Sequence, residues 1–210
     1  MTPWNFFAEH RAEILSATLD HLTLVAIAMA FAIAIALPVG MFIVQHRKLS
    51  SITLGITSVF QTIPSLALFG FLIPIPFIGG IGRRTAIVAL VLYALLPILR
   101  NTYVGLTGVD RSILEAAEAM GMTNSQILLR VRFPLALSVI LAGIRTATVI
   151  TIGVATIAAA IGAGGLGTFI FRGVAMVSDA VILAGAIPAA LLAITADLLL
   201  AALERGLKIA

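Results

Sequence analysis

Acidic side chains that could act together are rare in this sequence, and Glu115 and Glu118, three residues apart, are the pair closest in sequence. Two carboxyl groups at this spacing could serve as a general acid and a general base. They also surround Ala116 and Ala117, and small side chains let another protein approach closely. A groove with basic or hydrogen-bonding groups could hold both glutamates. We therefore expect a docking surface for a water-soluble partner and no enzyme active site, with an amphipathic hairpin lying flat on the membrane as the alternative.

Capping residues predict a short helix around these acids. Asp110 or Ser112 can cap its start, and Ser112 with Glu115 has the spacing of a capping box. Gly121 is placed to end the helix, because glycine adopts a left-handed conformation at little cost.

A second short helix is expected after this glycine. Thr123 with Gln126 offers another capping box, and Pro134 suits the first turn of the apolar helix that follows. Ordinary connections between helices run about 2–8 residues. The stretch 110–134 is therefore far longer than a link between two helices requires.

The composition places the chain among membrane proteins. It is 61% hydrophobic and 10% charged, with a mean hydropathy of +1.17. The net charge of +4 is spread over the loops, so it indicates topology and not nucleic-acid binding. The chain has no cysteine, and His10, His21 and His46 are scattered, so we expect no metal site.

Apolar segments predict an all-α, polytopic protein with about five membrane-spanning helices in a single domain, residues 1–210. The N-terminal residues 1–20 lack a cleavable signal and suggest an external segment with an interfacial helix over 3–17. The expected spans are 22–44, 52–78, 85–103, 135–161 and 180–203.

The second span is interrupted. Pro64 and Ser65 divide it, with Gln61 just before the break. Broken helices at membrane depth are tolerated beside a water-filled path or inside protein. A translocation path and a simple proline kink both fit.

Two charges fall within apolar segments, Arg145 and Asp197. An unpaired charge there is costly. We expect them to pair with each other or to face the path, while snorkelling of Arg145 to the interface is the alternative.

The segment 162–167 has the pattern G-x-G-x-x-G, but no strand precedes it, so a dinucleotide site is excluded. Gly164 and Gly165 instead suggest a turn at the outer side of the membrane. This turn could act as a gate or as a contact for a binding protein, and a purely structural turn is the alternative. The chain also lacks G-x-x-x-x-G-K-[ST], so it is not itself expected to bind ATP.

Lysine and arginine predict the orientation. One set of loops carries eight of them and the other set four, which assigns the first set to the cytoplasm. The N-terminus is then outside, and the C-terminus and the loop 110–134 are cytoplasmic. The first set is Arg47, Lys48, Arg100, Arg111, Arg130, Arg132, Arg205 and Lys208, and the second is Arg11, Arg83, Arg84 and Arg172.

The run Glu115-Ala116-Ala117 with Gly121 and Pro134 resembles the EAA loop of ABC-importer permeases. The segments 61–68, 93–102, 140–148 and 161–167 resemble the osmoprotectant branch of these permeases, whose substrates are glycine betaine, carnitine or choline. The resemblance covers about residues 55–200.

The resemblance implies that 105–134 is a cytoplasmic coupling loop that docks on a separate ATPase, which would bind ATP and Mg²⁺ in place of this chain. It also implies a second permease subunit, an extracytoplasmic substrate-binding protein, surrounding membrane lipid, and a place in the bacterial inner membrane. A permease for another small solute, a stand-alone channel or carrier, and a membrane scaffold are the alternatives.

Overall fold

The computed structural model describes residues 3–206, and over that range every regular element is a helix, with no strand. Four segments are long and apolar enough to span a membrane: α2 (Arg11–Ile43), α5 (Arg83–Thr107), the continuous helix Asn124–Ile161 that contains α8 (Phe133–Ile157), and α10 (Asp179–Gly206). A fifth span forms if α3 (Arg47–Thr62) and α4 (Ser65–Leu72), which are bent by 103° at their junction, count as one.

Shorter helices lie between the spans. They are α1 (Pro3–Glu9), α6 (Arg111–Ala119), α7 (Asn124–Gln126), the π-helical turn η1 (Ile127–Arg132), the 3₁₀ turn η2 (Ala158–Ile161) and α9 (Gly167–Ala175). The sequence did not predict α9. The expected interfacial helix over 3–17 is also wrong as a single element, because it is divided at His10 and its second part belongs to α2.

Several expected span boundaries differ from the structure; the second span, for example, begins at Arg47 and not at 52. The first span begins at Arg11, since the polar residues before 22 continue the helix, and the third runs on to Thr107. The second half of the broken span ends at Leu72 and does not reach 78, where Pro74 and Pro76 cannot supply backbone donors.

The second loop helix is not separate from the span that follows it. Residues from Asn124 to Ile161 form one continuous helix that passes through η1. Pro134 lies in the first turn of α8, directly after this π-helical turn.

Small residues bring the central helices together. The core between α2, α5 and α8 includes the fully buried Ala32, Ala94 and Ala147. Gly143 of α8 lies so close to α5 that an added Cβ would be 2.8 Å from the carbonyl oxygen of Pro97. Small side chains permit this close approach of helices in a membrane. Because α8 packs closely against α5, the positions of its charged and polar residues are also fixed.

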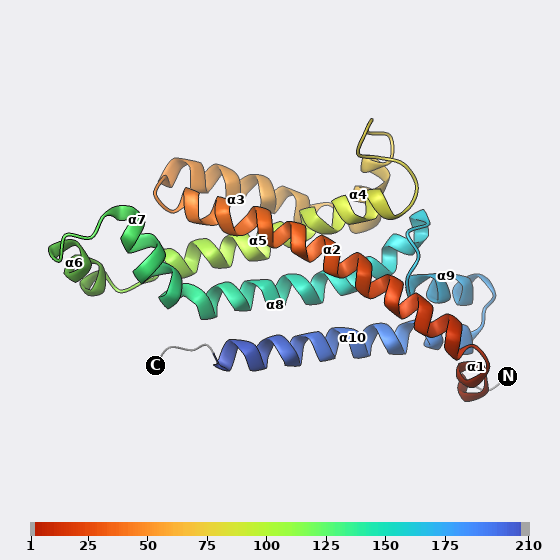
Figure 1. Ribbon diagram of the computed structural model, residues 1–210. Coiled ribbons are helices and arrows are strands. Elements are labelled where there is room, and N and C mark those ends of the chain that lie inside the picture. The colour runs from red at the N-terminus through yellow and green to blue at the C-terminus, as the bar shows by residue number, and fades with distance from the viewer. Residues whose placement is uncertain (1–2, 207–210) are drawn as a thin grey trace.

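The two expected sets of loops lie at opposite ends of the bundle (Figure 1). One end gathers α6, α7, the start of α3 and the end of α10, while the other gathers α1, α9 and the connection from α4 to α5. The first end carries the lysine and arginine residues assigned to the cytoplasm. Lys208, which belongs to the same set, lies outside the described residues.

Candidate translocation path and docking loop

Arg145 of α8 and Asp197 of α10 form a bidentate ion pair. The guanidinium Nε donates to Asp197 Oδ1 at 2.6 Å and Nη2 donates to Oδ2 at 3.2 Å. Arg145 Nη1 also donates to Glu204 Oε2 at 3.4 Å. The structure therefore forms the pairing that the sequence suggested and adds a second acid. Asp197 and Glu204 are seven residues apart, which places them two helical turns apart on one face of α10. This spacing could have predicted from the sequence that Glu204 joins the pair.

The three charged side chains do not suit a surface that faces lipid. Arg145 is 36% exposed, Asp197 37% and Glu204 18%, and both helices are among the apolar spans. Charges inside a bilayer face the bundle interior or a water-filled space. This face of α8 and α10 therefore needs water or another protein beside it.

A cavity of about 430 Å³ lies at the charged cluster. Besides the three charges it is lined by Ala142, Thr146, Val149 and Ile150, all from α8. The lining is small and mostly uncharged, so the cluster is the only strongly polar part of this cavity.

The break between α3 and α4 is held by two hydrogen bonds to α5. Gln61 Nε2 donates to the carbonyl oxygen of Tyr93 at 3.0 Å, and the Tyr93 hydroxyl donates to the carbonyl oxygen of Ile63. Ile63 is extended, with φ −74° and ψ 127°, as the residue before a proline prefers. In the sequence, Tyr93 is marked only as the first residue of the segment 93–102, and nothing there indicates its contact with the helix break.

A second cavity, of about 340 Å³, lies at this break. Gln61, Pro64 and Ser65 line it together with Ile150. Ile150 also lines the cavity at the charged cluster, so one face of α8 connects the two cavities. The candidate path residues from the broken helix and from α8 are thus brought to a common surface.

The glycine segment at the other end is tightly packed. Gly165 is buried with φ +79°, and an added Cβ would lie 3.1 Å from His21 Nδ1. The His21 ring is itself fully buried, and its Nε2 lies 3.1 Å from the carbonyl oxygen of Ile152. Gly164 also has a positive φ, +83°, but has open space at its Cβ position. This geometry suits a tight turn.

The loop 110–134 has the caps of two helices. Asp110 accepts hydrogen bonds from Ser112 N at 2.8 Å and from Ser112 Oγ at 2.9 Å. These bonds from Ser112 hold the pKa of Asp110 below its usual value. Because the folded pKa is depressed, this cap stabilises α6 above the unfolded pKa and is lost as pH falls through the folded pKa.

One expected cap does not form, and the other does. Glu115 does not complete a capping box with Ser112, because its Oε1 accepts from Arg111 Nε at 2.8 Å. Thr123 and Gln126 do form the reciprocal box, and Gly121 has φ +76° at the turn.

The alanines of the loop face in different directions. Ala117 is 2% exposed and packs inward, whereas Ala116 and Glu115 are exposed. Among residues 3–206 no group of three potential metal-ligating side chains comes together.

Residues 28–209 match the family described as "Binding-protein-dependent transport system inner membrane component". The chain belongs to this family. This inner membrane component is therefore a multi-pass protein whose long helices are the spans described above.

Relatives cover nearly the whole inner membrane component. It is 45% identical over 199 residues to the carnitine transport permease protein OpuCB of Listeria monocytogenes, covering 95% of this chain and 90% of the relative. It is 45% identical over 204 residues to the choline transport system permease protein OpuBD of Bacillus subtilis, covering 97% and 89%. The osmoprotectant import permease protein OsmW of Salmonella typhimurium is 45% identical over 202 residues, with 95% and 94% covered.

Solved structures share the fold. A chain of the MetNI methionine ABC transporter in an inward-facing conformation aligns with a TM-score of 0.81 at 24% identity, covering 92% of this chain and 95% of that chain. An amino acid ABC transporter crystallised with histidines gives a TM-score of 0.76 at 18% identity, covering 95% and 96%. The inner membrane component thus has the fold of an ABC-importer permease.

Proposed function

We propose that this inner membrane component is the permease subunit of an ATP-driven importer for a small osmoprotectant such as glycine betaine, carnitine or choline. The observation that carries the proposal is the identity of about 45% to permeases named for carnitine and choline transport, over nearly the full length of each chain. The matching segments include the broken span, the charged cluster and the loop 110–134.

The solute passes along the face of α8 that joins the two cavities. Gln61, Pro64 and Ser65 shape the path at the helix break, and the uncharged lining that follows leads toward Arg145 and Asp197. The ion pair keeps both charges satisfied beside water, as a path through a membrane requires. At the other end, Gly164 and Gly165 form the outer turn, close to where a binding protein delivers the solute.

The loop 110–134 couples the path to a cytoplasmic ATPase. Glu115 and Ala116 on α6 and Gly121 in the turn after it face outward, and Ala117 packs beneath them. Pro134 lies at the start of the span. The ATPase binds ATP and Mg²⁺, so this chain acts without a cofactor and without catalysis. Because α7, η1 and α8 are one continuous helix, a displacement of the loop is transmitted directly to the path. A second permease subunit encloses the path together with this one. The end of the bundle that carries the loop 110–134 faces the cytoplasm.

The coupling role is tested by Glu115→Lys and Gly121→Pro. Each should reduce recovery of the ATPase subunit with the tagged permease by about tenfold or more, since the first reverses an exposed charge and the second forces φ to about −65° where the turn has a positive φ. Co-purification in detergent measures this.

Glu9→Lys is the matched control, because it makes the same charge change on an exposed residue of α1 at the opposite end. It should leave recovery of the ATPase unchanged. Full recovery with both loop variants would contradict the coupling role.

A further inference from the structure

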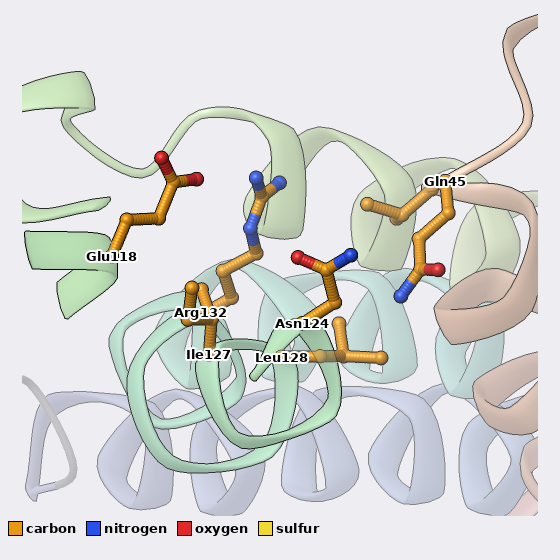
Figure 2. Close-up of a pocket in the computed structure, with 7 residues that line it drawn as sticks. Gln45, Glu118, Asn124, Ile127, Leu128 and Arg132 are labelled. Carbon is orange, nitrogen blue, oxygen red and sulfur yellow. The ribbon is translucent and has the colours of Figure 1, made fainter. Parts of the chain in front are cut away.

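Two of the cavities that lie outside the candidate path differ in polarity. The first, of about 270 Å³, lies at the cytoplasmic loop and has Glu118 and Arg132 among its lining residues (Figure 2). The second, of about 380 Å³, is a groove between α2, α8 and α10. Apart from His21, Thr148 and Thr195, the residues that line this groove are apolar. The groove is therefore the larger and the less polar of the two.

Two of the three polar side chains in the groove already bond the backbone of α8. His21 Nε2 lies 3.1 Å from the carbonyl oxygen of Ile152, and Thr148 Oγ1 donates to the carbonyl oxygen of Ile144 at 2.8 Å. The other ring nitrogen of His21 lies on the side of Gly165. A buried water needs about 2–4 polar partners. Water therefore does not suit the length of this groove.

The groove opens onto surfaces that face the hydrocarbon of the bilayer. Leu22 and Ala26 of α2 and Thr195 and Leu199 of α10 line it and are exposed, Leu199 to 67%. Both helices are long and apolar enough to span a membrane. At membrane depth there is no water, so acyl chains are what such surfaces contact. The groove is therefore continuous with the lipid around the spans.

The second half of α10 packs loosely. The buried residues of this helix all lie in its first half and are Ala180, Val181, Ala184, Gly185 and Ala189. None of the residues 190–206 is buried, although Leu192, Ala196 and Leu200 line the groove. An apolar surface beside a void loses its dispersion contacts. An apolar occupant of the groove would supply these contacts to the part of α10 that carries Asp197.

The second permease subunit of the proposed function belongs on a different face. The cavity at the charged cluster is lined from α8 and α10 by residues that include Arg145, Ile150 and Asp197. No residue lines both that cavity and the groove. A subunit that closes the path covers the face with the charged cluster. The face with the groove is then left to the bilayer.

We propose that the groove between α2, α8 and α10 binds an acyl chain of a bilayer phospholipid. The inference rests on the proposed function where it assigns the second subunit to the face with the charged cluster. The chain enters between Ala26 and Leu199, and the buried Met29 and Ile152 form the inner wall. The groove volume lies within the range of about 300–1,000 Å³ that is usual for ligand pockets.

The test compares Ala26→Phe with Ala34→Phe in the assembled permease–ATPase complex. Both alanines are exposed on α2, but only Ala26 lines the groove. Native mass spectrometry after washing in detergent measures the phospholipid that each permease retains. Ala26→Phe should retain at least about fivefold less phospholipid than wild type, because the added ring occupies the mouth of the groove. Ala34→Phe should retain as much as wild type.

A fluorescence measurement checks the groove within a bilayer. Trp4 is the only tryptophan of the chain, so Trp4→Phe combined with Ile33→Trp places a single reporter in the lining of the groove. In nanodiscs of phospholipid that is brominated on its acyl chains, this reporter should be strongly quenched. Adding Ala26→Phe should restore a large part of the lost fluorescence.

Equal lipid retention by wild type and Ala26→Phe, or equal quenching with and without Ala26→Phe, would overturn the proposal. Loss of the second permease subunit from Ala26→Phe with unchanged lipid retention would also overturn it, since the groove would then be a subunit contact.

Lipid retention requires no solute, so failure of this inference is distinguishable from failure of the proposed function. If the complete assembly takes up an osmoprotectant while Ala26→Phe keeps its lipid, only the lipid site is wrong. If the assembly takes up none while Ala26→Phe loses its lipid, only the proposed function is wrong.

Discussion

Replacing Arg145 with alanine should reduce uptake to less than about a tenth of the wild-type rate, because two carboxylates would then share one face of the path without a cation. Asp197 would lose both of its hydrogen bonds from the guanidinium, and Glu204 would lose its one. Breaking a partly buried pair from one side leaves an uncompensated charge, which is more harmful than removing both partners. Uptake of labelled solute by cells that produce the variant measures the effect.

The pair is tested further by removing the second charge. Asp197→Asn in the Arg145→Ala background should restore part of the lost uptake, while Asp197→Asn alone should be milder than Arg145→Ala because Arg145 keeps Glu204. Thr146→Ala, on the same face of α8, is the control for a change that leaves the charges intact. Wild-type uptake by Arg145→Ala would exclude the charged cluster from the path.

Gly167→Ala should destabilise the protein by about 3 kcal/mol, because there is no room for a methyl group at this position. An added Cβ would lie 1.9 Å from the carbonyl oxygen of Thr156 and 2.8 Å from the Cβ of Ala159. The nearest obstruction is backbone, so no side-chain rotation relieves it. The change should appear as a lower midpoint of thermal unfolding in detergent and a poor yield.

Gly153→Ala is the matched control for this prediction. Gly153 is in α8, and an added Cβ there would have no atom within 4 Å. Alanine is favoured over glycine in a helix by about 1 kcal/mol, so this variant should be at least as stable as wild type. Similar unfolding midpoints for Gly167→Ala and wild type would mean that the segment 162–167 is not packed as described.

Local patterns predicted much of this protein. Long apolar runs located the spans, and short polar patterns located the caps, because a cap depends on residues three or four positions apart. The box of Thr123 and Gln126 and the left-handed Gly121 are examples. The loop could therefore be divided into helices from sequence, although the continuity of its second helix with α8 could not.

Contacts between distant segments could not be predicted with equal success. Tyr93 contacts the helix break from another span, and Glu118 meets Gln45 and Arg132 in one cavity only after the chain has folded. The pair of Arg145 and Asp197 is one of the two arrangements expected from sequence, because few charges exist in the spans and each requires a partner or water. Helix starts were less certain, since polar residues such as those before 22 continue a helix without breaking its hydrogen bonds.

As proposed above, this chain forms the path of an ATP-driven osmoprotectant importer. The most direct measurement is uptake of radiolabelled glycine betaine, carnitine and choline into proteoliposomes that contain this permease with its ATPase and binding protein. We expect accumulation of at least one of these solutes that requires ATP, the binding protein and an intact loop 110–134. Uptake at the same rate without the ATPase, or no uptake of any of the three solutes by the complete assembly, would contradict the account.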